Sequence, residues 1–344
     1  MCNRLLNVSS FNENVIRMVG MDMATIREVA KLAGVSVATV SRVLNNRGYV
    51  HEDTKKSVEQ AIATLNYQPN AVARSLFKKT SNTIGFIIPD ITNPFFPQLV
   101  RVVERTLRKA GYTVLLINSD EELEQELNII ELMTSKYVDG IIIVSDTLKK
   151  EHLQNVKVPV VALDRIISDD IPTIAINNYE GARQAVRYLK ENGCKHIAHI
   201  QGPDNILSST ERIRGYLDEM KESNSEPYVF PGNFDLRTSM AATLKLLTEH
   251  PEVDGIFAGN DIMAVGAIKA ATNLGFQIPS KLKVIGFDGI EWGTTITPEL
   301  TTMAQPINTL GEKSVELLLN LIEGSYTGPK QFIFDAKLVK RGTC

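Results

Sequence analysis

Short apolar runs alternate with longer amphipathic stretches from Thr83 onward, and this alternation constrains the fold more than any other feature of the chain. The apolar runs are rich in isoleucine and valine, as is typical of buried strands. The stretches between them repeat apolar residues at helical spacing. Because alternating strands and helices form parallel sheets with helices on both faces, the sequence predicts an α/β fold.

The alternation occurs in two consecutive sets, which predict two doubly wound lobes. In the first set we expect strands at 83–88, 113–117, 140–144, 160–163 and 174–176, with helices at 98–110 and 123–136. In the second set we expect helices at 181–192, 211–222, 237–249 and 261–274, with strands at 196–200, 228–230, 255–258 and 283–287. The predicted core spans 81–340: lobe one is 81–177 plus 306–325, lobe two is 178–305 plus 329–340, and three strands cross between them.

Upstream of the core, residues 25–44 predict two short helices joined by a tight turn. Thr25 and Ser36 are suited to cap the two helices, and Gly34 permits the turn between them. The outer side of the second helix carries small side chains and one guanidinium, on Arg42. Such a pair places its second helix in the major groove of DNA. Taken alone, this stretch also fits an ordinary helical hairpin in a small bundle.

The next segment predicts a third helix at 53–67, which completes a three-helix headpiece at 23–68. Pro69 ends that helix, and residues 70–76 are helix-competent but too short to be stable alone, so 69–80 is expected to be a hinge. From Met23 to Thr80 there are nine Lys or Arg and four Asp or Glu, whereas the whole chain has 37 basic and 40 acidic residues. A basic N-terminal segment followed by an acidic remainder indicates that only the N-terminal segment contacts the phosphates of a nucleic acid.

The chain has 344 residues, too many for one average domain, and no apolar run long enough to span a membrane. Its three cysteines lack the paired spacing of a zinc site or a disulfide framework, which favours the reducing cytoplasm. Residues 1–22 lack the apolar region of a signal peptide, and we expect them to be a disordered extension or an artefact of an upstream start.

Polar and aromatic residues cluster at the predicted strand ends and helix starts, where ligands bind in open α/β sheets. They supply carboxylates, guanidiniums and amides for paired hydroxyls, and aromatic rings for C–H faces, a combination that suits a small polyol. The predicted effector-binding residues are Asn93, Phe95, Phe96, Asp164, Arg165, Arg212, Phe234, Asn260, Asp288 and Gln305. The set contains no nucleophile–base pair and no metal cluster, so we expect no cofactor and no metal.

Single members of this set also have ordinary interpretations. Phe95 and Phe96 fit core positions, and Asn260 fits a helix cap. Asp164 and Arg165 fit a surface ion pair of little energetic value. Their joint placement at strand ends favours a binding site.

Residues 25–76 resemble the DNA-binding headpiece and hinge of the lactose-repressor family. In that family the segment matching 70–76 folds on operator DNA, and its leucine, here Leu76, wedges into the central minor groove of a palindromic site. The resemblance implies DNA contacts by Thr25, Val37, Ala38, Thr39, Ser41, Arg42, Asn70, Ala73, Arg74 and Leu76.

Residues 82–340 resemble the ligand-binding core of the same family and the related periplasmic sugar-binding proteins. All ten predicted effector-binding residues carry the type that ribose-binding proteins use. The resemblance therefore implies a cytoplasmic homodimeric repressor of a ribose utilisation operon, which D-ribose releases from a palindromic operator.

Three other classes compete with this interpretation. A dinucleotide-binding enzyme would carry glycines after its first strand, but residues 89–92 are Pro-Asp-Ile-Thr, so we expect no enzyme. A sugar-binding protein of a transport system would carry an export signal in place of a basic headpiece. A regulator of the same family that answers another sugar, a purine or a phosphorylated partner protein is the alternative that the sequence leaves open.

Overall fold

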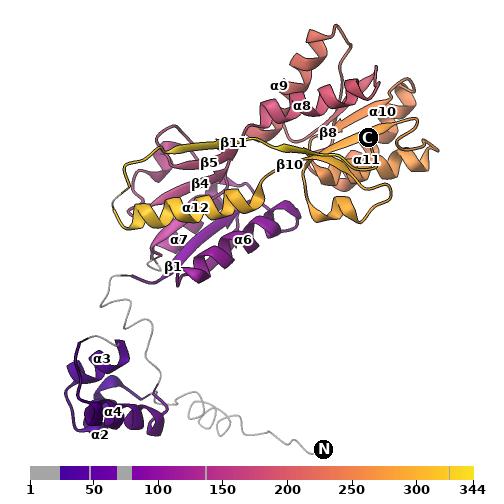
Figure 1. The fold of residues 1–344 in the computed structure, drawn as a ribbon. Coiled ribbons are helices and arrows are strands. Elements are labelled where there is room, and N and C mark those ends of the chain that lie inside the picture. Colours follow the sequence, from indigo (N-terminus) through magenta and orange to yellow (C-terminus); the bar gives the residue numbers. More distant parts are fainter. Residues whose placement is uncertain (1–23, 46–47, 68–79, 136–137, 325) are drawn as a thin grey trace, which may run out of the picture. The chain divides into compact units, whose positions relative to one another are not determined.

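The computed structural model describes residues 24–45, 48–67, 80–135, 138–324 and 326–344. The chain divides into two compact units, Met1–Lys79 and Thr80–Cys344, and each is described by itself (Figure 1). The predicted N-terminal extension at 1–22 and most of the predicted hinge lie outside the described residues, including Asn70, Ala73, Arg74 and Leu76.

The described residues of the first unit form three helices: α2 (Ile26–Ala33), α3 (Val37–Asn45) and α4 (Glu52–Thr64). Thr25 caps α2 in a reciprocal capping box with Glu28, and Gly34 ends α2 with φ = 67°. Ser36 caps α3, because its hydroxyl accepts a hydrogen bond from the Thr39 N–H at 3.1 Å. The predicted caps and turn are therefore confirmed.

A small apolar core holds the three helices together. Its fully buried members come from α2, α3 and α4 and are Val29, Ala30, Val40, Val58 and Ala61. The third helix ends three residues earlier than predicted: Leu65 closes α4, and Tyr67 packs against the core beyond the helix end.

The second unit contains two six-stranded sheets, one in each lobe. The sheet of lobe one has the order β11-β5-β4-β3-β1-β2, and all its strand pairs are parallel. Its strands are β1 (Thr83–Ile88), β2 (Thr113–Asn118), β3 (Gly140–Ile143), β4 (Val160–Asp164), β5 (Thr173–Ile176) and β11 (Gln331–Phe334). Its helices are α6 (Phe95–Lys109), α7 (Leu123–Ser135), the short η1 (Lys150–Leu153) and α12 (Ile307–Ile322), which packs beside α6 (Figure 1).

The sheet of lobe two has the order β12-β10-β9-β8-β6-β7, and only its edge strand β12 is antiparallel. Its strands are β6 (Ile197–Gln201), β7 (Tyr228–Pro231), β8 (Gly255–Ala258), β9 (Lys283–Asp288), β10 (Thr301–Ala304) and β12 (Lys337–Val339). Its helices are α8 (Asn178–Glu191), α9 (Leu207–Glu222), α10 (Leu236–Glu249), α11 (Asp261–Asn273) and the short η2 (Glu291–Thr294). The central strands β8 and β9 are buried on both faces, as is typical of parallel sheets covered by helices.

The chain crosses between the lobes three times: after β5, after β10 and between β11 and β12. Figure 1 shows β11 and β12 as segments of one strand-like path that runs from one lobe to the other. The expectation that 329–340 belongs entirely to lobe two is wrong. Residues 331–334 pair in parallel with β5 and extend the sheet of lobe one, and only the segment after them joins lobe two.

Apolar clusters fill both faces of each sheet, and one cluster is continuous across the two lobes. In the described part of the chain, no helix is both long and apolar enough to cross a lipid bilayer.

Candidate functional site

The ten side chains that the sequence singles out as effector-binding all line one small cavity between the lobes. Ser208 is the eleventh residue that lines this cavity. Lobe one supplies residues at the start of α6 and the end of β4. Lobe two supplies residues from α9, from the end of β9 and from the segments around β7, β10 and α11. We call this space the inner cavity.

The backbone is strained at three of these positions. Asp164 has φ = 69°, Phe234 has φ = 54° and Asp288 has φ = 111°. Residues other than glycine adopt such angles at a cost, and they gather at binding and catalytic sites. Gly202 lies against the Phe234 ring, so that a Cβ there would approach the ring to 2.4 Å. The fold therefore positions these side chains rather than leaving them to relaxed loops.

A buried cation and a buried carboxylate form the lobe two side of the inner cavity. Arg212 donates to Asn178 Oδ1 at 2.9 Å, to the Gly259 carbonyl at 2.6 Å and to Asp288 Oδ1 at 3.3 Å. Its guanidinium carbon also lies 3.8 Å from the centre of the Phe287 ring. These contacts fix the guanidinium in one orientation, as a binding group requires.

The Asp288 carboxylate has a second partner in lobe two. Gln305 Nε2 donates to Asp288 Oδ1 at 2.9 Å. Burial raises the pKa of Asp288, while Arg212 and this hydrogen bond act in the opposite direction. Arg212 and Gln305 thus share one oxygen of Asp288, and Oδ2 has no partner among the contacts described for this carboxylate.

Lobe one contributes a second buried acid and base. Asp164 and Arg165 form the ion pair considered from sequence, with Arg165 Nε 3.8 Å from Asp164 Oδ2, but the two residues are 7% and 4% exposed, so the pair is buried and not on the surface. Burial raises the pKa of Asp164 to about 6, although Arg165 opposes the rise. Among the described residues, Asp164 Oδ1, Arg165 Nε and Gln305 Oε1 are buried without a hydrogen-bond partner. Unpaired buried donors and acceptors around one cavity suit a ligand that both donates and accepts hydrogen bonds, as hydroxyl groups do.

Two of the ordinary interpretations made from sequence are correct, and the residues concerned also line the inner cavity. Phe95 and Phe96 belong to the apolar core, meet edge to face at 5.3 Å between ring centres, and also line the inner cavity. Asn260 caps α11 by accepting from the Met263 N–H at 2.8 Å, and it too lines the cavity.

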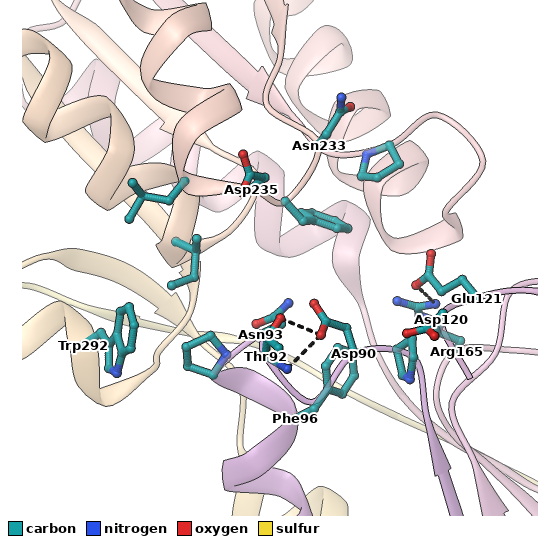
Figure 2. Close-up of a pocket in the computed structure, with 16 residues that line it drawn as sticks. Asp90, Thr92, Asn93, Phe96, Asp120, Glu121, Arg165, Asn233, Asp235 and Trp292 are labelled. Atoms are coloured by element: carbon teal, nitrogen blue, oxygen red, sulfur yellow. Dashed lines mark hydrogen bonds and ion pairs between the residues drawn. The ribbon is translucent and has the colours of Figure 1, made fainter. Parts of the chain in front are cut away.

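A larger outer chamber adjoins the inner cavity, with which it shares Asn93, Phe96, Arg165 and Phe234. Figure 2 shows its walls. Asp90, Thr92 and Asn93 lie on one side, Asn233 and Asp235 lie opposite, Trp292 lies at one end, and Asp120, Glu121 and Arg165 lie at the other. Four of these side chains are carboxylates and Arg165 alone is a base, so the chamber is acidic.

Among the described residues of the first unit, five of the predicted DNA-binding residues lie on α3, and Thr25 caps α2. Val37, Ala38 and Arg42 are exposed, and Thr39 and Ser41 are half-buried. Thr25 is exposed but engaged, since its hydroxyl donates to Glu28 Oε2 at 3.0 Å. The exposed face of α3 therefore presents one long base among small side chains.

Sequence reasoning missed two residues at the core site. Ser208 lines the inner cavity, and Asp146 forms an ion pair with Arg165 in which Oδ2 and Nη1 are 2.6 Å apart. Asp146 lies three residues after the last residue of β3, so the strand-end rule that found the other residues could also have found it. Ser208 lies on α9, whose first turn the sequence pattern did not predict.

Two family models match the chain. The model described as bacterial regulatory proteins of the lacI family matches residues 25–70, and that of periplasmic binding proteins and the sugar-binding domain of the LacI family matches residues 81–342. Together they cover both compact units.

A ribose operon repressor from Halalkalibacterium halodurans is 46% identical over 321 residues, covering 93% of this chain and 97% of the relative. The lac repressor dimer, solved with operator and the anti-inducer ONPF, has a TM-score of 0.84 at 30% identity and covers 93% of this chain and 98% of its own. A periplasmic binding protein/LacI transcriptional regulator from Alkaliphilus metalliredigens, solved with D-xylulofuranose, has a TM-score of 0.70 at 35% identity and covers 76% of this chain and 98% of its own. These relatives are regulators and not enzymes.

Proposed function

Since this chain belongs to the LacI family of bacterial regulatory proteins, we propose that it represses a ribose utilisation operon and leaves its operator when D-ribose binds. The single observation that carries the choice of sugar is the inner cavity. All ten residues of the ribose-binding pattern line it together.

The chemistry of the inner cavity supports a neutral polyol. Asp164 and Asp288 accept hydrogen bonds from hydroxyl groups, and Arg165 and Arg212 donate to hydroxyl oxygens. Phe95, Phe96 and Phe234 supply apolar surface for the C–H faces of a sugar ring.

The first unit supplies the DNA-binding half of the proposal. A homodimer would present two copies of α3, with Arg42 directed at a base in each half of a palindromic site. The lac repressor, which matches nearly the whole chain, was solved as a dimer on its operator. The proposed response is induction: a sugar held by both lobes favours one lobe angle, and that angle changes operator affinity through a reciprocal coupling of about 1–3 kcal/mol.

Another pentose is the second candidate effector. The relative from Alkaliphilus metalliredigens was solved with D-xylulofuranose, a five-carbon ketose, and it shares the fold of the second unit.

Titration calorimetry of the full chain with D-ribose, D-xylulose, D-glucose and hypoxanthine separates these candidates. D-ribose is expected to bind most tightly. Tighter binding of D-xylulose would transfer the proposal to that sugar, and binding of hypoxanthine alone would make the chain a purine-responsive member. Operator binding, measured by fluorescence anisotropy, should weaken when the bound sugar is added, and stronger binding would reverse the sign to co-repression.

A further inference from the structure

A hydrogen bond joins the two lobes beside the inner cavity. Asp146 lies just after β3 in lobe one, and Leu207 is the first residue of α9 in lobe two. The Leu207 N–H donates to Asp146 Oδ1 at 3.0 Å, and the Asp146 side chain is 7% exposed. A carboxylate of one lobe thus caps a helix of the other.

Helix α9 has no polar cap of its own. Ile206 occupies its N-cap position and has no side-chain oxygen to accept from the first turn. Helix α10, by contrast, has its own polar N-cap, because the Asp235 carboxylate accepts a hydrogen bond from the Thr238 N–H at 2.7 Å. Free N–H groups at a helix start favour a carboxylate, so α9 is completed only when lobe one brings Asp146 to it.

The second oxygen of Asp146 reaches the effector site. Asp146 Oδ2 lies 2.6 Å from Nη1 of Arg165, a side chain that lines the inner cavity. On the other side of the link, α9 brings Ser208 and Arg212 to the same cavity. One carboxylate therefore contacts a cavity residue of lobe one and the helix that carries cavity residues of lobe two.

The segment that carries Asp146 is held in place by a buried acid. Glu126, fully buried in α7, accepts from the Ser145 hydroxyl at 2.7 Å and from the Thr147 hydroxyl. The Ser145 hydroxyl in turn accepts from the Thr147 N–H at 3.2 Å. Both neighbours of Asp146 are thus fixed, which orients its carboxylate before any ligand binds.

We propose that Asp146 is a positioning residue that holds the lobes in the effector-binding arrangement: it orients Arg165 and completes α9 without touching the effector. The identity of the effector rests on the proposed function, whereas the link between the lobes does not. Binding across the cleft is strengthened because the link has already ordered groups on both sides.

The link is tested on the sugar-free full chain by amide hydrogen exchange in wild type, Asp146→Ala and Asp146→Asn. Exchange at Leu207 should quicken in Asp146→Ala and stay near wild type in Asp146→Asn, because asparagine caps helices as well as aspartate does. The Thr238 amide in α10 is the internal reference and should not change. Equal exchange at Leu207 in wild type and Asp146→Ala would overturn the proposal.

The second measurement is D-ribose affinity by calorimetry. Loss of a helix cap corresponds to about 2- to 30-fold weaker binding for Asp146→Ala. Asp146→Asn should also bind more weakly, since it removes one of the two carboxylate charges that contact Arg165 Nη1, the other being that of Glu121. The exposed Asp170→Asn serves as the matched control and should match wild type. Unchanged affinity in both Asp146 variants would refute the positioning role. If wild type binds no ribose, the proposed sugar fails, and the Leu207 exchange still decides whether the lobes are linked.

Discussion

Replacement of Asp288 by asparagine tests the central contact of the proposed sugar site. Asparagine is chosen over alanine because Asp288 has φ = 111°, an angle that a Cβ tolerates poorly and that asparagine and aspartate adopt more readily than other residues. The substitution keeps the shape of the side chain and removes its charge. It therefore changes what the sugar meets while leaving the backbone turn in place.

The expected loss of affinity follows from the hydrogen bonds of the carboxylate. Arg212 and Gln305 both donate to Oδ1 of Asp288, so Oδ2 is the oxygen that remains for a sugar hydroxyl. A hydrogen bond to a charged group contributes about 1.5–3 kcal/mol, which corresponds to about 10- to 150-fold weaker binding of D-ribose. The free energy of unfolding should fall less than the ~3–5 kcal/mol of a broken buried pair, because Arg212 still has Asp164 nearby.

Trp292 provides a convenient readout. It is the only tryptophan of the chain, it lines the outer chamber, and it is 51% exposed. Titration of its fluorescence with D-ribose, checked by calorimetry, gives the affinity of wild type, Asp288→Asn and the control Asp170→Asn. Operator affinity without sugar should be equal in all three proteins. Ribose affinity of Asp288→Asn within twofold of wild type would show that this carboxylate does not contact the sugar.

The remaining predictions concern DNA, pH and stability. Arg42→Ala should cost about 1–3 kcal/mol at one operator base pair in a binding assay across operator variants, whereas equal weakening on every sequence would make Arg42 a phosphate contact. Because the pKa of Asp164 is raised to about 6 and the sugar should prefer the ionised form, ribose affinity should fall as pH drops below about 6, and Asp164→Asn should flatten that calorimetric profile. Burial lowers the pKa of His199 to about 4. Between about pH 6.5 and 4 the imidazole is therefore protonated in the unfolded chain but stays neutral in the folded chain. The His199 contribution to the free energy of unfolding should therefore fall by about 3 kcal/mol across that range in urea titrations, and His199→Phe should show a smaller loss on acidification; an identical loss would contradict this assignment.

The strand ends of the core could be predicted from sequence because apolar runs such as the one before Asp288 stop abruptly at polar residues. That rule brought ten side chains to one cavity, since parallel strands end at the same edge of a sheet. The lobe of β11 could not be predicted in this way. The sequence of a short edge strand can indicate that it is a strand, but it does not indicate which sheet the strand joins. Gln331–Phe334 pairs with β5 of lobe one and not with the sheet of lobe two.

Residues whose role depends on contacts made only in the folded chain were the hardest to predict from sequence. Ser208 became part of the cavity only because α9 begins at Leu207, four residues before the predicted start. A small hydroxyl residue at a helix start is also an ordinary solvent-facing residue, so residue type alone could not single it out. Asp146 depends on contacts with Arg165 and Leu207, which are distant in sequence and come together only in the folded lobes.

The three crossings between the lobes also set the order in which the protein can fold during its synthesis. The three described helices of the first unit share a core of residues that are close in sequence, and this core can pack once residues up to Tyr67 have emerged from the ribosome. Neither lobe of the second unit can complete its sheet so early, because the edge strands β11 and β12 lie at 331–334 and 337–339. The two sheets that frame the inner cavity are therefore completed last, and a nascent chain can carry a folded helical unit well before the inner cavity is complete.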